Sequence, residues 1–248
     1  MQLREGKYLV KLAENASEKE QVYRLRHNVY HKEMNFAGKQ TEGEQEYDSY
    51  DEICDHLMIC DEEAGQCVGT FRFLSGKRLQ GNQGFYSEQW FDIGQLKCER
   101  NRVLELGRAC IDIPYRNTKV FKLLFSGVGA YLKLFPHDYM IGLTTVSFDS
   151  RTDIKMIIEY LTEKKVVNIS FGVKPKKDFY IDEAEGGSYT IAAVSEREII
   201  NKMSTLMLAY YKYGAEFISE PSVDADFNPP VVDFFTIFPA EKYPSWAS

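Results

Sequence analysis

The feature that most constrains the fold is a strand–helix–strand pattern in the middle of the chain. Residues 104–112 read LELGRACID, an apolar strand that carries an acid, Glu105, and a base, Arg108. A Pro-containing turn follows, and apolar residues at helical spacing then predict a helix over about 118–135. Residues 139–146 predict a second buried strand. Two strands joined by a helix normally lie side by side with a right-handed connection, so the pattern predicts an α/β domain.

The charges inside the first of these strands make it the candidate reaction centre, because an unpaired buried charge is costly. Strict alternation would put Glu105 and Arg108 on opposite faces of the strand. A β-bulge at Gly107 would shift the register and could turn both side chains toward one cleft. A bulge also leaves backbone N–H groups unpaired, and such groups can donate to a developing oxyanion. A structural ion pair remains the alternative for each charged residue.

The other expected elements fit one domain over residues 1–248, since no linker and no internal repeat divides the chain. Further helices are expected over about 18–34, 153–164 and 196–213, and further strands over 8–12, 54–60, 67–74, 189–194 and 231–238. The first helix begins with SEKE, which has the form of a capping box with Ser17 as N-cap. His27 and His31 lie one turn apart on it. No third ligand accompanies them, which favours a solvated helix face over a metal site.

A polar, acidic stretch over residues 35–51 shows no periodicity. One interpretation is a mobile surface loop. The other is a lid that orders over the substrate and brings Asp48 and Asp51 to the site.

Composition excludes several classes of protein. The chain has 248 residues, 44% hydrophobic and 27% charged, as is ordinary for a globular protein. It lacks a signal-peptide core and a transmembrane-length apolar run. A net charge of −7 argues against non-specific nucleic-acid binding. Five cysteines without a CxxC pair indicate reduced thiols in the cytoplasm.

Common catalytic and cofactor motifs are absent from the sequence. It contains no P-loop, GxGxxG, GxSxG, HExxH or zinc-spaced cysteine set. The candidates that remain are carboxylates and arginines: Arg26, Asp48, Asp51, Arg72, Glu105 and Arg108.

A resemblance to a known family runs through most of the chain. Beside ELGRACI at 105–111 and Tyr115-Arg116, the matching segments are YRLRHNVY at 23–30, YDEICDHL at 50–57, VGTFR at 68–72, GFYSE at 84–88, YGA at 213–215, EPSVD at 220–224 and DFN at 226–228. In this order they resemble the ornithine-lipid-type N-acyltransferases. These form a GNAT-related group, often labelled hemolysin-like, and are cousins of the acyl-homoserine-lactone synthases.

The resemblance implies both a fold and a reaction. The fold would be a GNAT-like α/β (α+β) domain, with a mixed central sheet, helices on both faces and a split between the two central strands. The reaction would move a fatty acyl group from acyl carrier protein to the α-amine of an amino acid, giving an N-acyl amino acid or a lyso-ornithine-lipid-type product. The alternatives are an acyl-CoA-dependent N-acetyltransferase and a non-catalytic acyl-carrier or lipid-binding module.

The resemblance also implies roles for the charged residues. Glu105 would accept the proton of the attacking amine, with Arg108 as its catalytic neighbour. Arg26 and Arg72 would bind substrate, and Asp48 and Asp51 would orient the lid or the ammonium group. Covalent catalysis by Cys110 is an alternative, although a small buried strand residue is the favoured interpretation.

One departure from the acetyl-CoA enzymes concerns the acyl donor. Those enzymes place a Gly-rich turn after this strand, whereas residues 116–121 here read RNTKVF. A single phosphate, as on the 4′-phosphopantetheine of acyl carrier protein, has no need of that turn. The residues expected to contact the carrier or its phosphopantetheine are Ala109, Cys110, Ile111, Arg116, Lys119 and Lys122.

We therefore expect acyl carrier protein and an amino acid as partners, with an acyl-carrier thioester, or acyl-CoA, as co-substrate. No bound cofactor, metal or nucleic acid is expected. The expected location is cytoplasmic. Peripheral contact with the inner membrane face, oligomeric state, acyl length and the identity of the amino acid are left open by the sequence.

Overall fold

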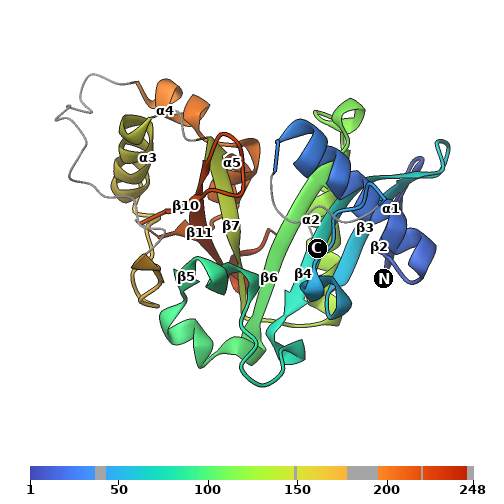
Figure 1. Ribbon diagram of the computed structural model, residues 1–248, viewed down its shortest axis with the longest axis horizontal. Helices are drawn as coiled ribbons and strands as arrows, with labels where there is room; N and C mark the ends of the chain where they lie inside the picture. Colours follow the sequence, from blue (N-terminus) through green and yellow to red (C-terminus); the bar gives the residue numbers. More distant parts are fainter. Residues whose placement is uncertain (37–42, 148–149, 178–194, 219, 245–248) are drawn as a thin grey trace.

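The computed structural model describes residues 1–36, 43–147, 150–177, 195–218 and 220–244. Within them, nine strands form one mixed sheet in the order β1-β2-β3-β4-β6-β7-β11-β10, with β9 also paired to β11 (Figure 1). The strands are β1 Gln2–Glu5, β2 Tyr8–Leu12, β3 Asp55–Asp61, β4 Gln66–Ser75, β6 Val103–Ile111, β7 Tyr139–Ser147, β9 Glu216–Phe217, β10 Ser222–Asp224 and β11 Val231–Pro239. Two short strands, β5 Phe91–Asp92 and β8 Lys174–Pro175, pair separately.

The strand–helix–strand unit is present and lies at the centre of the sheet. Helix α2, Val120–Leu134, joins β6 to β7, and these two strands are parallel. Their pairing covers only residues 103–105 against 139–141, after which the strands part. The sheet is therefore split between its two central strands, as the resemblance implied. Figure 1 shows β6 and β7 close together at their beginnings and apart at their ends.

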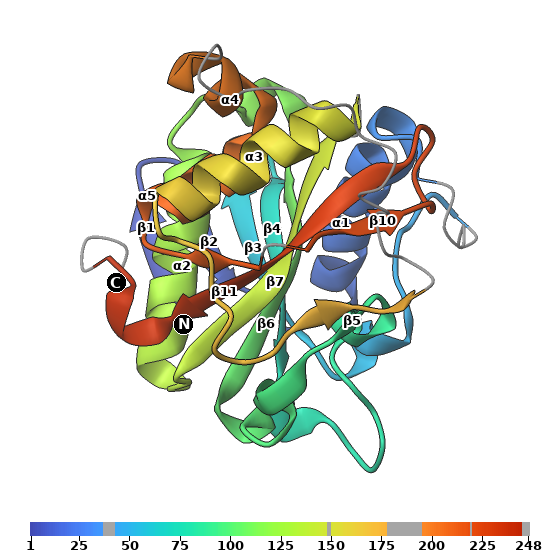
Figure 2. The same cartoon turned by 90° about the vertical axis from the view of Figure 1, so that its left-hand side faces the viewer.

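Helices cover both faces of the sheet (Figure 2). Helix α1, Ala16–His27, lies on one face, and its Val22 and Leu25 pack with Met58 of β3. Helices α2, α3 (Arg151–Glu163) and α5 (Thr205–Lys212) lie on the other face. Alternation in β3 explains this division, because Leu57 and Ile59 point to the α2 side whereas Met58 points to α1.

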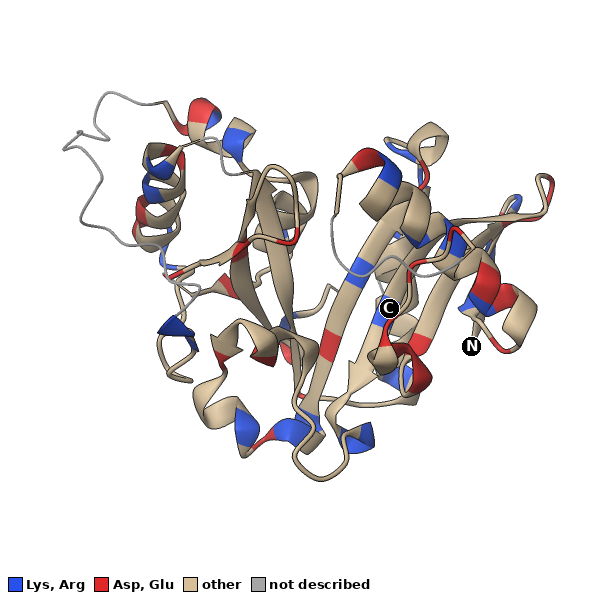
Figure 3. Cartoon of the chain, viewed as in Figure 1, with Lys and Arg blue, Asp and Glu red and all other residues tan. Residues whose placement is uncertain are grey.

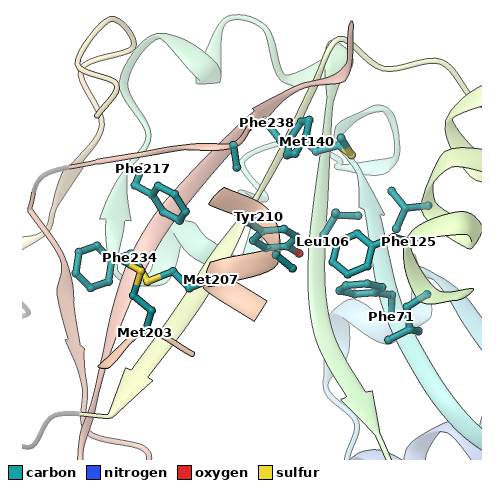
Figure 4. Close-up of a cluster of buried hydrophobic side chains, with 14 of the residues drawn as sticks. Phe71, Leu106, Phe125, Met140, Met203, Met207, Tyr210, Phe217, Phe234 and Phe238 are labelled. Atoms are coloured by element: carbon teal, nitrogen blue, oxygen red, sulfur yellow. The ribbon is translucent and has the colours of Figure 1, made fainter. Parts of the chain in front are cut away.

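The main core joins the two halves of the split sheet. Phe71 of β4 and Leu106 of β6 lie with Phe125 of α2, while Met207 and Tyr210 of α5 pack against β7 and β11 (Figure 4). Gly127 allows α2 to approach the sheet, since a Cβ there would lie 2.6 Å from a methyl carbon of Leu57.

Several expected boundaries differ from the structure. The N-cap of α1 is Asn15, whose side chain accepts from the backbone N–H of Glu18, so Ser17 lies inside the helix. Beyond α1 the chain continues as a π-helical turn, Asn28–Glu33. The single helix expected at 196–213 is two helices, α4 (Glu196–Lys202) and α5, because Ser204 begins α5 as its N-cap. The strand expected at 189–194 lies outside the described residues. No described helix is long and apolar enough to cross a membrane.

Candidate active site

A β-bulge interrupts the pairing of β4 and β6 in the middle of the predicted reaction centre. Thr70 pairs with Cys110 and Arg72 pairs with Gly107, so Arg108 and Ala109 together face the single position of Phe71. The left-handed residue of the bulge is Arg108, with φ +52°, and not the neighbouring glycine. The bulge predicted at Gly107 is present one residue later along the strand.

The bulge turns Glu105 and Arg108 toward one cavity, as predicted. The cavity is open to solvent and lies where β6 and β7 part, and its empty space, with the solvent at its mouth included, is about 600 Å³. Figure 3 shows one acidic and one basic position along β6, in a strand that is otherwise uncharged. Residues of both halves of the sheet line the cavity. One side consists of Arg72, Leu74, Glu105, Leu106, Gly107 and Arg108, and the other of Leu143, Thr145, Asp224 and Asp233, with Tyr30, Phe36, Tyr86 and Phe227 around them.

Glu105 is held by the backbone of a short 3₁₀ helix, Tyr86–Gln89. Its carboxylate accepts from the N–H of Tyr86 at 2.6 Å and from the N–H of Ser87 at 2.8 Å, and only 4% of the residue is exposed. Burial raises the pKa of Glu105 even though these N–H groups and the nearby Arg72 favour its charged form. A buried carboxylate with a raised pKa at the wall of a cavity is suited to accept a proton.

Arg26 lies behind the cavity and does not line it. Its side chain is fully buried and forms a two-point ion pair with Asp51, at 2.7 and 3.0 Å, and a contact with Glu46. Burial raises the pKa of Glu46, but Arg108 and Arg26 outweigh it and hold that pKa at about 2. Arg26 and Asp51, expected to contact the substrate, thus stabilise the wall of the site from behind.

Arg72 and Arg108 reach the cavity and are oriented by shared carboxylates. Nη1 of Arg72 donates to both oxygens of Asp48 at 2.8 Å and to Asp51 at 3.3 Å. Arg108 pairs with Glu46 at 3.0 Å and with Asp48 at 3.3 Å. The carboxylates of Glu46, Asp48 and Asp51 therefore balance the charges of the three arginines.

The acidic stretch expected to be a loop or a lid is anchored in its described part. Asp48 caps the 3₁₀ helix Ser49–Glu52, and the ion pairs of Glu46, Asp48 and Asp51 tie residues 46–51 to three elements of the fold. Residues 37–42 of this stretch lie outside the described residues. Glu46 was missed by sequence reasoning, because nothing in its acidic surroundings distinguished it from Glu44, which is exposed.

Aromatic rings surround the guanidinium group of Arg108. The ring centroids of Tyr86, Tyr30 and Phe36 lie 4.6, 5.3 and 5.9 Å from its Cζ atom, and Tyr86 Oη accepts from Nη2 at 3.2 Å. Such faces stabilise a cation. They also hold the side chain in place at the wall of the cavity.

The opposite wall carries two buried carboxylates that sequence reasoning did not select. Asp233 on β11 is 2% exposed, and its Oδ1 accepts from Thr145 Oγ1 at 2.6 Å. Asp224, at the end of β10, is 5% exposed. Burial raises the pKa of Asp233 to about 7. A charged residue inside the apolar run VVDFFTIF was the signal that could have found Asp233.

Comparisons with known proteins agree with this geometry. Residues 25–126 match the family described as "Acetyltransferase (GNAT) domain". An L-ornithine N(alpha)-acyltransferase of Agrobacterium fabrum is 28% identical over 246 residues, which cover 96% of this chain and 82% of that protein. The chain is an acyltransferase with the GNAT fold.

Solved structures support the fold of this acyltransferase. A CoA-dependent acyl-homoserine lactone synthase, BjaI, with SAM and isopentyl-CoA, matches with a TM-score of 0.50 at 12% identity, over 90% of this chain and 77% of that chain. An aminoglycoside 6'-N-acetyltransferase complexed with coenzyme A matches with a TM-score of 0.50 at 13% identity, over 93% and 96% of the two chains. The resemblance of the sequence to ornithine-lipid-type N-acyltransferases is confirmed.

The residues expected to contact the acyl donor occupy the far end of β6 and the start of α2. Cys110 is 2% exposed, and burial raises the pKa of its thiol, which makes it a poor nucleophile. Ala109 and Ile111 are half-buried beside it. Asn117, with φ +61°, makes the turn for which a glycine is usual.

The three basic residues expected to meet the carrier differ in their surroundings. Arg116 forms a two-point ion pair with Glu33 and donates to the carbonyl oxygen of Ile111. Lys119 lies 3.5 Å from Glu5. Lys122 is exposed on α2. Arg116 is half-buried, whereas the two lysines are exposed.

His27 ends α1, His31 lies in the π-helical turn that follows, and both are half-buried. The rings of His27 and His31 lie 5.0 Å apart. Within the described residues, no group of three or more His, Cys, Asp or Glu side chains could hold a metal ion.

Proposed function

We propose that this acyltransferase moves a fatty acyl group from the thioester of an acyl carrier protein to the α-amine of an amino acid of the ornithine type. The observation that carries the proposal is that the buried Glu105 lines the same cavity as Arg72 and Arg108, where the central strands part. The relatives named L-ornithine N(alpha)-acyltransferase, which span most of the chain, support this acceptor.

Arg72 is suited to bind the carboxylate of the amino acid. All three of its ion contacts use Nη1. Among the described residues, no hydrogen bond from its Nε or Nη2 is formed, and these two N–H groups form the side of a guanidinium that binds a carboxylate at two points. Gly107 leaves space there, since a Cβ added at this position would lie 4.0 Å from Arg72 Nε and, chain neighbours aside, within 4 Å of no other described residue.

Glu105 then lies beside the expected position of the amine. The neutral α-amine attacks the thioester carbonyl, a C–N bond forms, and Glu105 accepts the proton that the nitrogen loses, directly or through a water molecule. The C–S bond breaks, and the thiolate of the phosphopantetheine takes up a proton as it leaves. Backbone N–H groups at the Arg108–Ala109 bulge are the candidate donors to the oxyanion.

A small apolar hollow on the opposite face of the split is the candidate place for the start of the acyl chain. This hollow is lined by Leu106 of β6, Met140 and Gly142 of β7, and Tyr210 and Phe238. Its exposed surface is apolar, but its volume is only about 10 Å³, so a hydrocarbon chain would enter only with movement of these side chains. The outward-facing Lys119 and Lys122 fit the acidic surface of a carrier protein, and the cytoplasmic location expected from the sequence fits such a donor.

The test is an acyl-transfer assay with purified protein. Long-chain acyl carrier protein, long-chain acyl-CoA and acetyl-CoA are each offered with a panel of amino acids, and N-acyl products are measured by mass spectrometry. We expect product from acyl carrier protein and ornithine. Product only with acetyl-CoA would favour the N-acetyltransferase alternative, and long-chain product only from acyl-CoA would contradict the carrier as donor.

A matched pair of variants on α2 tests the docking surface. We expect Lys122→Glu to raise KM for acyl carrier protein several-fold, because reversing a charge at the rim of an interface weakens association. Lys133→Glu, exposed at the other end of the same helix, is the control. Equal KM values for the two variants would contradict docking at the start of α2.

A further inference from the structure

Asp224 and Asp233 have no part in the mechanism described so far, although both line the cavity. They come from β10 and β11, across from Arg72 and Glu105. Asp233 is paired in the sheet with Thr145 of β7 and Ser222 of β10, so its backbone position is fixed by neighbouring strands on both sides.

These two carboxylates lack the arginine contacts that Glu46, Asp48 and Asp51 have. Among the described residues, no Lys, Arg or His nitrogen lies within 4.0 Å of either one. The single side-chain donor to Asp233 is Thr145, which reaches Oδ1, and no described residue donates to its Oδ2. Asp224 receives only the backbone N–H of Asp226, also at Oδ1. By contrast, Glu46, Asp48 and Asp51 each contact an arginine.

A buried carboxylate without a cation costs free energy that a bound cation would recover. Asp233 is 2% exposed and presents its free oxygen in a cavity that already offers a carboxylate site at Arg72 and a base at Glu105. Burial raises the pKa of Asp233 to about 7, and the charge of Asp224 adds to this, although the hydrogen bond from Thr145 and the more distant charge of Arg108 act in the opposite direction. The wall formed by Asp224 and Asp233 is therefore suited to bind a positive group of the ligand whose carboxylate lies at Arg72.

We propose that Asp224 and Asp233 bind the side-chain ammonium of a diamino acid, and that they make the acyltransferase selective for such an acceptor. The inference rests on the proposed function and adds the two residues that bind the side chain of the acceptor amino acid. The carboxylate of the acceptor lies at Arg72, its α-amine at Glu105, and its second amine on the opposite wall. An acceptor without the second amine leaves both carboxylates unpaired, and a site built around a polar group rejects the analogue that lacks it.

The experiment compares ornithine with norvaline, which has the same carbon chain without the second amine. In the wild-type protein, we expect kcat/KM to be higher for ornithine. In Asp233→Asn and Asp224→Asn, we expect kcat/KM for ornithine to fall about 10²-fold, with norvaline unchanged or improved. Activity toward norvaline also reports that the variants are folded. Asp226→Asn, exposed in the same turn, is the matched control and should leave both values unchanged.

Other outcomes would overturn the inference. An equal fall for ornithine and norvaline would mean that the aspartates serve the α-amine or the fold. No change for either amino acid would mean that the aspartates do not contact the acceptor.

A calorimetric binding measurement separates this inference from the proposed function. If the protein acylates no amino acid, but binds ornithine more tightly than norvaline in an Asp233-dependent way, the proposed reaction is wrong and the ammonium site stands. If ornithine binding in that case does not depend on Asp233, the site is wrong as well.

Discussion

Arg26 illustrates how one side chain can be essential to a site that it does not enter. Its guanidinium is fully buried and bonded to Asp51 and Glu46, which in turn orient Arg72 and Arg108. Removing one member of a buried ion-pair network leaves an uncompensated charge, which costs far more than the loss of a surface pair.

We therefore predict that Arg26→Gln lowers the free energy of unfolding by about 3–5 kcal/mol. Arg24→Gln, which breaks an exposed pair with Glu20 on the same helix, should cost less than about 1 kcal/mol. Urea unfolding of both variants at one pH gives the comparison. If both variants lost less than about 1 kcal/mol of the free energy of unfolding, the buried network would contribute no more than a surface ion pair.

Glu105 poses the opposite question, since its proposed role is chemical. We predict that Glu105→Gln lowers kcat at least about 10²-fold, because the amide cannot accept the amine proton. The fold should persist, since the side-chain oxygen can still accept from a backbone N–H of the 3₁₀ helix. Glu63→Gln, exposed in the β3–β4 turn, is the control. Full activity of the Glu105 variant in a folded protein would remove the residue from its assigned role.

At the scale of the element, the central strands place two glycines in different surroundings. Gly107 on β6 faces open space beside Arg72, whereas a Cβ at Gly142 on β7 would lie 2.6 Å from the carbonyl oxygen of Leu106. The first glycine leaves room for a ligand, and the second allows β7 to pass close to β6 just where the two strands part.

These surroundings predict opposite consequences for the same substitution. Gly142→Ala should lower stability by about 1–3 kcal/mol, because the methyl group overlaps a backbone atom. Gly107→Ala should change stability by less than about 1 kcal/mol, but should raise KM for the amino acid, since the methyl group narrows the space at Arg72. Thermal unfolding and initial-rate kinetics test the pair. A destabilised Gly107→Ala with normal KM would contradict this assignment.

At the scale of the whole molecule, two buried carboxylates whose pKa values are shifted in opposite directions affect how stability depends on pH. The pKa of Glu46 is lowered to about 2 in the folded protein, so its contribution is present above about pH 4.5 and is lost as pH falls through 2. The pKa of Asp233 is raised from 3.8 to about 7, so the folded state is penalised as pH rises, with the full penalty above about 7.

Asp233→Asn should therefore stabilise the unliganded protein at pH 8, by at most about 4 kcal/mol, and the gain should shrink toward zero near pH 4. Denaturant unfolding of wild type and variant at several pH values measures this difference. In Asp226→Asn, where the carboxylate is exposed, no such pH-dependent gain is expected. A gain independent of pH would mean that packing, and not charge, is responsible.

The sequence alone determined the central unit of the fold. Apolar spacing in residues 104–146 is local information, and it predicted β6, α2, β7 and the parallel arrangement of the two strands. The sequence also identified Glu105, Arg72 and Arg108 as charged residues within strands, where a buried charge needs a partner. The ordered family segments indicated the fold and the acyltransferase reaction.

The tertiary structure decided which residues meet. The bulge lies at Arg108 because its position depends on the register against β4, which no local pattern specifies. Glu46 reaches Arg26 across 20 residues, and Asp233 stands opposite Glu105 although 128 residues separate them. The sequence shows which residues are charged, but it does not show which of them are buried or paired, because that depends on how distant strands pack together. Burial and pairing distinguish the structural carboxylates from those that face the cavity.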